Sequence, residues 1–269
     1  MPLITISGYM GCGVPEIAHN VATGLNLEIY DDQELLELAP KVGILSEDLE
    51  ALRNPGFFSR LFRNSPQVYM DYMDAIIYEI SRRGEGVIIG HGSHILLQDF
   101  GCALHVRINA PEAARLEIIR KQGELDVDAA RKLLQKTDNK QRKFSRLAFD
   151  MDLDDPDLYD LILNSAKIGY ETIAKLVMDT ARAEEMNACS LTALEAMERL
   201  SILRRIQGTL LNNDLDDSML TINIVEGGIV ELSGLSNDSE SMNRIIETIK
   251  NVQGVQKVHS ELVISPHLY

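Results

Sequence analysis

Basic residues are scarce in this sequence, which has 26 Lys and Arg against 41 Asp and Glu and a formal net charge of -15. Nucleic-acid phosphates and anionic lipid headgroups recruit proteins through an excess of Lys and Arg. We therefore expect no nucleic-acid partner, and membrane binding is disfavoured. Any phosphorylated ligand has to be held by a local arrangement of donors.

Cysteines are also few, and long apolar runs are absent. Cys12, Cys102 and Cys189 are odd in number, widely spaced and without a Cys-x-x-Cys pair, so we expect neither a disulfide nor a metal site. No apolar stretch approaches the length of a membrane span, and no basic region precedes the strand-like residues 3–6. These absences predict a cytoplasmic protein.

The sequence does contain alternating strand and helix patterns over its first two thirds. Short apolar runs at residues 3–7, 27–30, 87–89, 104–108 and 158–163 predict strands, with helical segments between them. This alternation is typical of an α/β fold with a parallel sheet flanked by helices. Because the pattern breaks at about residue 187, a chain of 269 residues predicts two domains, 1–185 and 194–266.

The second predicted domain has a different rhythm. A helix at about 194–211 precedes an alternating strand at 220–224, a Gly-Gly turn and a returning strand at 229–232. A further helix and a final strand follow. The order αββαβ predicts a small α+β module with an antiparallel sheet backed by helices.

A glycine-rich loop lies between the first predicted strand and the helix after it. Gly8 and Gly13 have the spacing of the pattern Gly-x-x-x-x-Gly-Lys-[Ser/Thr], in which backbone amides converge on phosphate oxygens. The predicted phosphate-binding residues of the loop are Gly8, Gly11, Cys12, Gly13 and Val14. However, Val14 and Pro15 stand where phosphoryl transfer requires lysine and a hydroxyl group. A tight turn without a ligand is the alternative.

The order of segments resembles the cytidylate-kinase-like family, relatives of nucleoside monophosphate kinases, over about residues 3–177. The resemblance rests on the strand and loop at 4–13, on Tyr30-Asp31, on the Val-Ile-Ile-Gly-His-Gly stretch at 87–92 and on residues 155–165. It implies a P-loop kinase-like fold with a nucleotide or other small phosphorylated ligand. In an active enzyme it implies ATP and Mg²⁺ as well.

Two positions depart from the family by losing positive charge. Where the family usually reads Gly-Arg-Gly, this chain has His91 in place of the arginine, and where the family's lid segment usually has an arginine, this chain has Gln141. Arginines at such places stabilise the charge of the transferring phosphate. When protonated, His91 could replace the missing arginine as a phosphate ligand, although an ordinary turn histidine is the simpler interpretation.

Several charged residues remain as catalytic candidates. The resemblance implies that Asp31 lies near Mg²⁺ or the acceptor hydroxyl, or else that it caps the helix that follows. Lys140, Arg142 and Arg146 belong to a polar helical stretch that could close over a nucleotide, although a solvated helix face is the commoner meaning of such a run. We interpret the acidic residues at 150–157 as a solvated loop rather than a cation site.

The segment at about 200–264 resembles a BON domain, through its Gly-Gly hairpin at 227–234 and the Gly-Val-Gln-Lys-Val step at 254–258. The resemblance implies a sensory or oligomerising module, so a homo-oligomer is one expectation.

Two functions are expected for the whole chain. The lost charges favour a nucleotide-binding protein with weak or no phosphotransfer and a regulatory or sensory role, and the alternative is an active ATP-dependent kinase of the CMP type.

Overall fold

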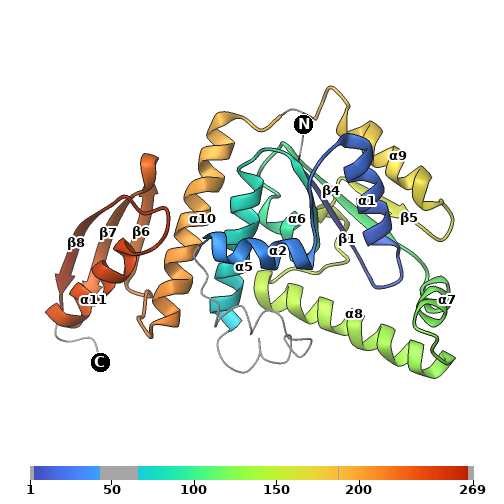
Figure 1. Ribbon diagram of the computed structural model, residues 1–269. Helices are drawn as coiled ribbons and strands as arrows, with labels where there is room; N and C mark the ends of the chain where they lie inside the picture. Colours follow the sequence, from blue (N-terminus) through green and yellow to red (C-terminus); the bar gives the residue numbers. More distant parts are fainter. Residues whose placement is uncertain (1–2, 43–65, 187, 266–269) are drawn as a thin grey trace. The chain divides into compact units, whose positions relative to one another are not determined.

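A computed structural model describes residues 3–42, 66–186 and 188–265 of the chain (Figure 1). The chain divides into two compact units. The first comprises Met1–Glu34 and Arg83–Ser190, and the second comprises Leu35–Arg82 and Leu191–Tyr269. Within the described ranges, no helix combines the length and apolar character needed to cross a membrane.

The first unit is built on a parallel sheet of five strands in the order β2-β3-β1-β4-β5, which confirms the predicted α/β fold. The strands are β1 Leu3–Gly8, β2 Ile29–Tyr30, β3 Gly86–Ile89, β4 Ala103–Asn109 and β5 Leu161–Asn164. The helices are α1 Val14–Leu25, α6 Ser93–Leu96, α7 Glu112–Gln122, α8 Val127–Phe149 and α9 Tyr170–Ala181, and α2 Asp32–Leu38 follows β2. A short 3₁₀ helix at Pro156–Leu158 precedes β5.

The two faces of the central strands β1 and β4 differ in chemistry. Side chains alternate between the faces of a strand. The apolar set, which belongs to the core shared with α1 and α9, is Ile4, Ile6, Leu104, Val106 and Ile108. The alternate positions include four buried polar residues, namely Thr5, Ser7, His105 and Arg107. The Thr5 hydroxyl and His105 Nδ1 are hydrogen-bonded at 2.9 Å. The arginine of β4 is therefore buried on the polar face of the sheet.

A disulfide joins Cys102, just before β4, to Cys189, which follows α9. The Cα atoms of the two residues are 4.9 Å apart although 87 positions separate them in the chain. The prediction of no disulfide was therefore wrong. It relied on sequence spacing, whereas disulfide formation depends on the distance between the two Cα atoms in the fold. Cys12 is a free, buried cysteine.

The second unit contains a three-stranded sheet in the order β6-β7-β8. Its elements are α5 Pro66–Ser81, α10 Leu191–Asn212, β6 Leu220–Val225, β7 Ile229–Ser236, α11 Ser239–Lys250 and β8 Lys257–Ile264, with 3₁₀ turns at Ala39–Val42 and Glu226–Gly228. Strands β6 and β7 are antiparallel, as predicted, but β8 is parallel to β7. The prediction of a wholly antiparallel sheet was wrong because α11 is a crossover connection that returns the chain in the direction of β7.

Helix α5 packs along α10 within this unit, and buried charges line their contact. Arg205 donates to Glu79 at 2.6 Å, and Arg204 lies 3.4 Å from both Asp71 and Asp74. Burial raises the pKa of Asp71 to about 6 and that of Asp74 to about 7, against the opposing effect of Arg204. The helix pair therefore contains carboxyl groups that change charge near neutral pH.

Candidate phosphate-binding site

The glycine loop between β1 and α1 has the tight geometry that its sequence predicts. Gly11 and Gly13 have φ values of 83° and 81°, in the left-handed region that favours glycine. A Cβ atom at Gly13 would lie 2.3 Å from the ring of Tyr170. The amide of Cys12 donates to the carbonyl of Tyr9 at 3.1 Å, so one amide predicted to meet phosphate closes a turn of the loop itself.

The position of the missing lysine is occupied by a core side chain. Val14 is 7% exposed and belongs to the core beneath the sheet. A Cβ atom on Gly8 would come within 2.7 Å of Val14 Cγ2, so the valine lies close against the start of the loop. Pro15 occupies the first turn of α1, where its missing amide costs no helical hydrogen bond. The loop itself therefore supplies no positive side chain.

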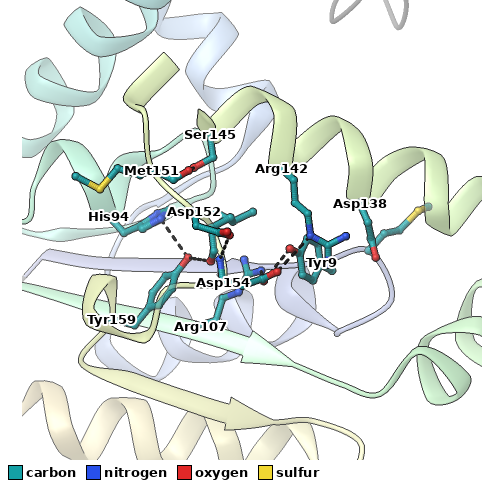
Figure 2. A network of polar contacts seen from close by, with 12 residues as sticks. Tyr9, His94, Arg107, Asp138, Arg142, Ser145, Met151, Asp152, Asp154 and Tyr159 are labelled. Atoms are coloured by element: carbon teal, nitrogen blue, oxygen red, sulfur yellow. Dashed lines mark hydrogen bonds and ion pairs between the residues drawn. The ribbon is translucent and has the colours of Figure 1, made fainter. Parts of the chain in front are cut away.

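Positive charge comes instead from three arginines on other elements, whose guanidinium groups lie around the ring of Tyr9. Figure 2 shows two of them, Arg107 and Arg142, beside Tyr9 and Asp154. The guanidinium carbons of Arg107, Arg142 and Arg115 lie 4.4, 4.9 and 5.3 Å from the ring centroid. They extend from β4, α8 and α7 respectively. We call Tyr9, Arg107, Arg115 and Arg142 the Tyr9 cluster. Arginine stacks favourably on aromatic faces and binds oxyanions through paired donors.

Two carboxylates balance part of this charge. Asp138 of α8 accepts two hydrogen bonds from Arg115, at 3.0 and 2.8 Å, and both side chains are buried. Arg115 also donates to the Met10 carbonyl at 3.2 Å, which links the pair to the glycine loop. Asp154 accepts from the Tyr9 hydroxyl at 2.7 Å and from Arg107 and Arg142, each at 3.2 Å. Three guanidinium groups and two carboxylates leave a local positive charge in an acidic chain.

Burial shifts the pKa values of two neighbouring groups. Burial, together with the hydrogen bond to Asp154, raises the pKa of Tyr9 well above its usual range, so its hydroxyl stays a donor. Burial lowers the pKa of His94 to about 3, so this histidine is neutral at physiological pH and stacks on Tyr159 as an uncharged ring. Among the described residues of the Tyr9 cluster, the positive charge is therefore that of the arginine side chains.

The predicted catalytic residues are distributed over several places. Arg142 belongs to the Tyr9 cluster, whereas Arg146, four residues further along α8, is exposed and pairs with Asp152 at 3.0 Å. Lys140 is a half-buried residue of the same helix. Asp31 accepts hydrogen bonds from the amides of Gln33 and Glu34, at 2.8 and 3.3 Å. Asp31 therefore makes the contacts of a helix cap, and its catalytic role stays a prediction.

His91 lies where β3 ends, in a run of three residues with positive φ. Gly90, His91 and Gly92 have φ values of 69°, 54° and 72°. His91 Nε2 is 2.7 Å from a carboxylate oxygen of Asp32, and this hydrogen bond lowers the pKa of Asp32. His91 has a left-handed backbone, which is costly for a non-glycine residue, and its ring contacts the first residue of α2.

Sequence reasoning missed most of the Tyr9 cluster. The available signal was Arg107, a charged residue inside an apolar strand, because buried arginines are rare without a partner. Arg115 and Asp138 lie on two predicted helices, and nothing in the sequence indicates that they meet. Asp154 was assigned to a solvated acidic loop and is indeed exposed, but nothing in the sequence indicated that its carboxylate is the shared acceptor of three donors.

The parallel five-stranded sheet, its flanking helices and the glycine loop after β1 define a P-loop kinase-like domain. A solved structure of an uncharacterized protein from Eubacterium ventriosum has a similar fold, with a TM-score of 0.55, 17% identity and coverage of 67% of this chain and 97% of that chain. The chain belongs to the cytidylate kinase-like family, whose family model matches residues 3–167. A BON domain matches residues 201–266.

Curated relatives carry the name cytidylate kinase. A protein from Methanocaldococcus jannaschii is 27% identical over 178 residues, which cover 65% of this chain and 94% of the relative. Another, from Pyrobaculum islandicum, is 24% identical over 181 residues and covers 66% of this chain and 92% of the relative. These alignments span nearly the whole of each relative, so the C-terminal third of this chain lies largely outside the similarity.

Proposed function

We propose that this protein binds a nucleotide, or another small phosphorylated ligand, between the glycine loop and the Tyr9 cluster, and that it performs little or no phosphoryl transfer. Its role is then regulatory or sensory, with ligand binding reported through the BON domain. The observation that carries this proposal is the placement of charge. Val14 lies in the core where a catalytic loop extends a lysine, while three arginines from other elements supply positive charge beside the loop.

Binding is supported by the preorganisation of these arginines. Arg107 is 2% exposed and Arg115 is 6% exposed, so their guanidinium groups are fixed by packing. Hydrogen bonds between guanidinium groups and phosphate oxygens are charge-assisted and are about twice as strong as neutral ones. Since the chain as a whole carries a charge of -15, attraction of a phosphate depends on this local cluster.

Weak transfer is supported by the residues available for ATP and Mg²⁺. The hydroxyl residue that usually holds the metal is replaced by Pro15. The carboxylates that follow β2 are already engaged, Asp31 as a helix cap and Asp32 with His91. The residues at these positions therefore fit a catalytic Mg²⁺ poorly.

An active ATP-dependent kinase of the CMP type is the second candidate. It is favoured by membership of the cytidylate kinase-like family and by the relatives that carry the cytidylate kinase name. In that case Arg107 and Arg142 would provide charge stabilisation that the loop lacks. Lys140 and Arg146 would be further contributors from α8.

Calorimetric titration of the purified chain with CMP, CDP and ATP, combined with an ADP-release assay with Mg²⁺, separates these candidates. We expect binding of at least one nucleotide without acceptor-dependent ADP formation. Arg142→Gln should weaken that binding by about tenfold or more, because it removes a charge-assisted contact. The matched control is Arg131→Gln, an exposed change on the same helix. Acceptor-dependent turnover that Arg142→Gln abolishes would establish the kinase instead.

A further inference from the structure

The carboxylate of Asp154 accepts hydrogen bonds from three donors of the Tyr9 cluster. One oxygen accepts from the Tyr9 hydroxyl and from Arg107, and the other accepts from Arg142 (Figure 2). Arg115 is committed elsewhere, through its paired contact with Asp138 and its bond to the Met10 carbonyl. Arg107 and Arg142 are therefore the exchangeable cations of the cluster, and Asp154 is the acceptor that they share.

A ligand from solvent can reach Asp154, whose side chain is 47% exposed, and Arg142, whose side chain is 41% exposed. Arg107, which also contacts Asp154, is 2% exposed. A phosphate monoester presents the same kind of oxygen acceptors as a carboxylate, with one more oxygen and more negative charge. A ligand phosphate therefore competes with Asp154 for the same two guanidinium groups.

The chain around Asp154 allows this exchange to be local. Leu153 is buried in the core, and its carbonyl accepts a hydrogen bond from the Tyr159 hydroxyl at 2.8 Å. On the other side, Asp155 caps the short 3₁₀ helix that begins at Pro156. Both neighbours of Asp154 are thus anchored, so its carboxylate can leave the arginines by side-chain rotation while the segment stays in place.

We propose that Asp154 is an internal competitor that occupies the anion site of this domain, and that the phosphate group of a nucleotide binds by displacing it. The inference rests on the proposed function, because it assigns the ligand phosphate to Arg107 and Arg142. Its consequence is regulatory. At low concentrations of the phosphorylated ligand, the carboxylate of Asp154 occupies the site. When phosphate binds, it releases the contact between Tyr9 of the glycine loop and Asp154 of the segment after α8.

The test compares the native chain with Asp154→Asn and with the control Asp157→Asn, which removes the same charge from an exposed residue of the same segment. Inorganic phosphate and CMP are titrated by calorimetry in chloride buffer. We expect Asp154→Asn to bind both about tenfold more tightly than the native chain, because an amide competes weakly for guanidinium groups. Asp157→Asn should bind within about twofold of the native chain.

A second variant guards against a folding defect, because Asp154→Asn leaves the buried Arg107 without its carboxylate partner. Tyr9→Phe removes one donor to Asp154 and keeps the carboxylate, so we expect about a threefold gain in phosphate affinity. Phosphate should also raise the melting temperature of Asp154→Asn more than that of the native chain.

The outcomes distinguish this inference from the proposed function. If the native chain binds phosphate or CMP and Asp154→Asn binds them equally well or more weakly, the internal-competitor proposal is overturned and the proposed function is not. If Asp154→Asn binds phosphate or CMP and the native chain does not, the internal-competitor proposal is supported. Failure of all four proteins to bind phosphate or CMP at millimolar concentration overturns both proposals.

Discussion

The buried ion pair between Arg115 and Asp138 offers the sharpest test of how the site is held together. Replacing Asp138 with alanine leaves the guanidinium group of Arg115 buried without its carboxylate, although one contact to the Met10 carbonyl remains. Both side chains are 7% exposed, so water cannot replace the lost partner. Breaking a buried pair in this way costs about 3–5 kcal/mol, and we expect Asp138→Ala to lower the free energy of unfolding by that amount.

Urea denaturation followed by circular dichroism measures this change against two references. Asp128→Ala removes an exposed acid of the same helix, whose contact with Arg131 is 3.5 Å long, and should cost less than about 1 kcal/mol. The double variant Arg115→Met, Asp138→Leu replaces both charges with apolar groups of similar volume and should recover most of the loss. The reasoning is refuted if Asp138→Ala costs no more than Asp128→Ala, or if the double variant is less stable than the single one.

Three further predictions address other parts of the molecule. Cys189→Ser removes a disulfide that closes a loop of 87 residues and should lower the free energy of unfolding by about 2–4 kcal/mol, measured by thermal denaturation with and without reductant. Burial raises the pKa of Asp74 to about 7, so between pH 4 and 7 the folded state binds a proton that the unfolded state has lost. The free energy of unfolding should therefore fall by up to about 4 kcal/mol as the pH rises from 4 to 7, and Asp74→Asn should reduce this dependence on pH. Gly13→Ala should cost about 2–4 kcal/mol because it forces a Cβ atom against the Tyr170 ring at positive φ, whereas Gly169→Ala, which meets no atom within 4 Å, should be much better tolerated.

The architecture was predictable where the sequence has a regular pattern of apolar residues or a clear turn signal. Apolar runs bounded by helical segments identified the parallel sheet, and the Gly-Gly turn at 227–228 identified the hairpin of β6 and β7. The direction of β8 was not predictable in the same way, because an apolar strand pattern is the same for either orientation. The predicted domains 1–185 and 194–266 stay a prediction, since the compact units group Leu35–Arg82 with the chain from Leu191 onward.

The site was predictable only in its local part. The glycine loop could be identified because its residues are adjacent in sequence, and the cap at Asp31 because its partners are two and three residues away. The hydrogen bonds between the Tyr9 cluster and its two carboxylates join residues 23 positions apart in one case and 145 in another. No propensity or spacing rule encodes such distances. A single sequence shows which side chains carry charge, and the fold decides which of them meet.

The relocation of positive charge from the loop to other elements has a physical consequence for the whole site. A lysine after the glycine loop is a flexible point charge, whereas the arginines of β4 and α7 are fixed by burial and by stacking on Tyr9. Because Val14 then carries no charge, it can complete the core beneath α1. The same burial makes each guanidinium group depend on a carboxylate, since an unpaired buried charge is costly. An anion site built from buried arginines therefore requires resident acids, and the more exposed of the two, Asp154, is the one that a phosphate can replace.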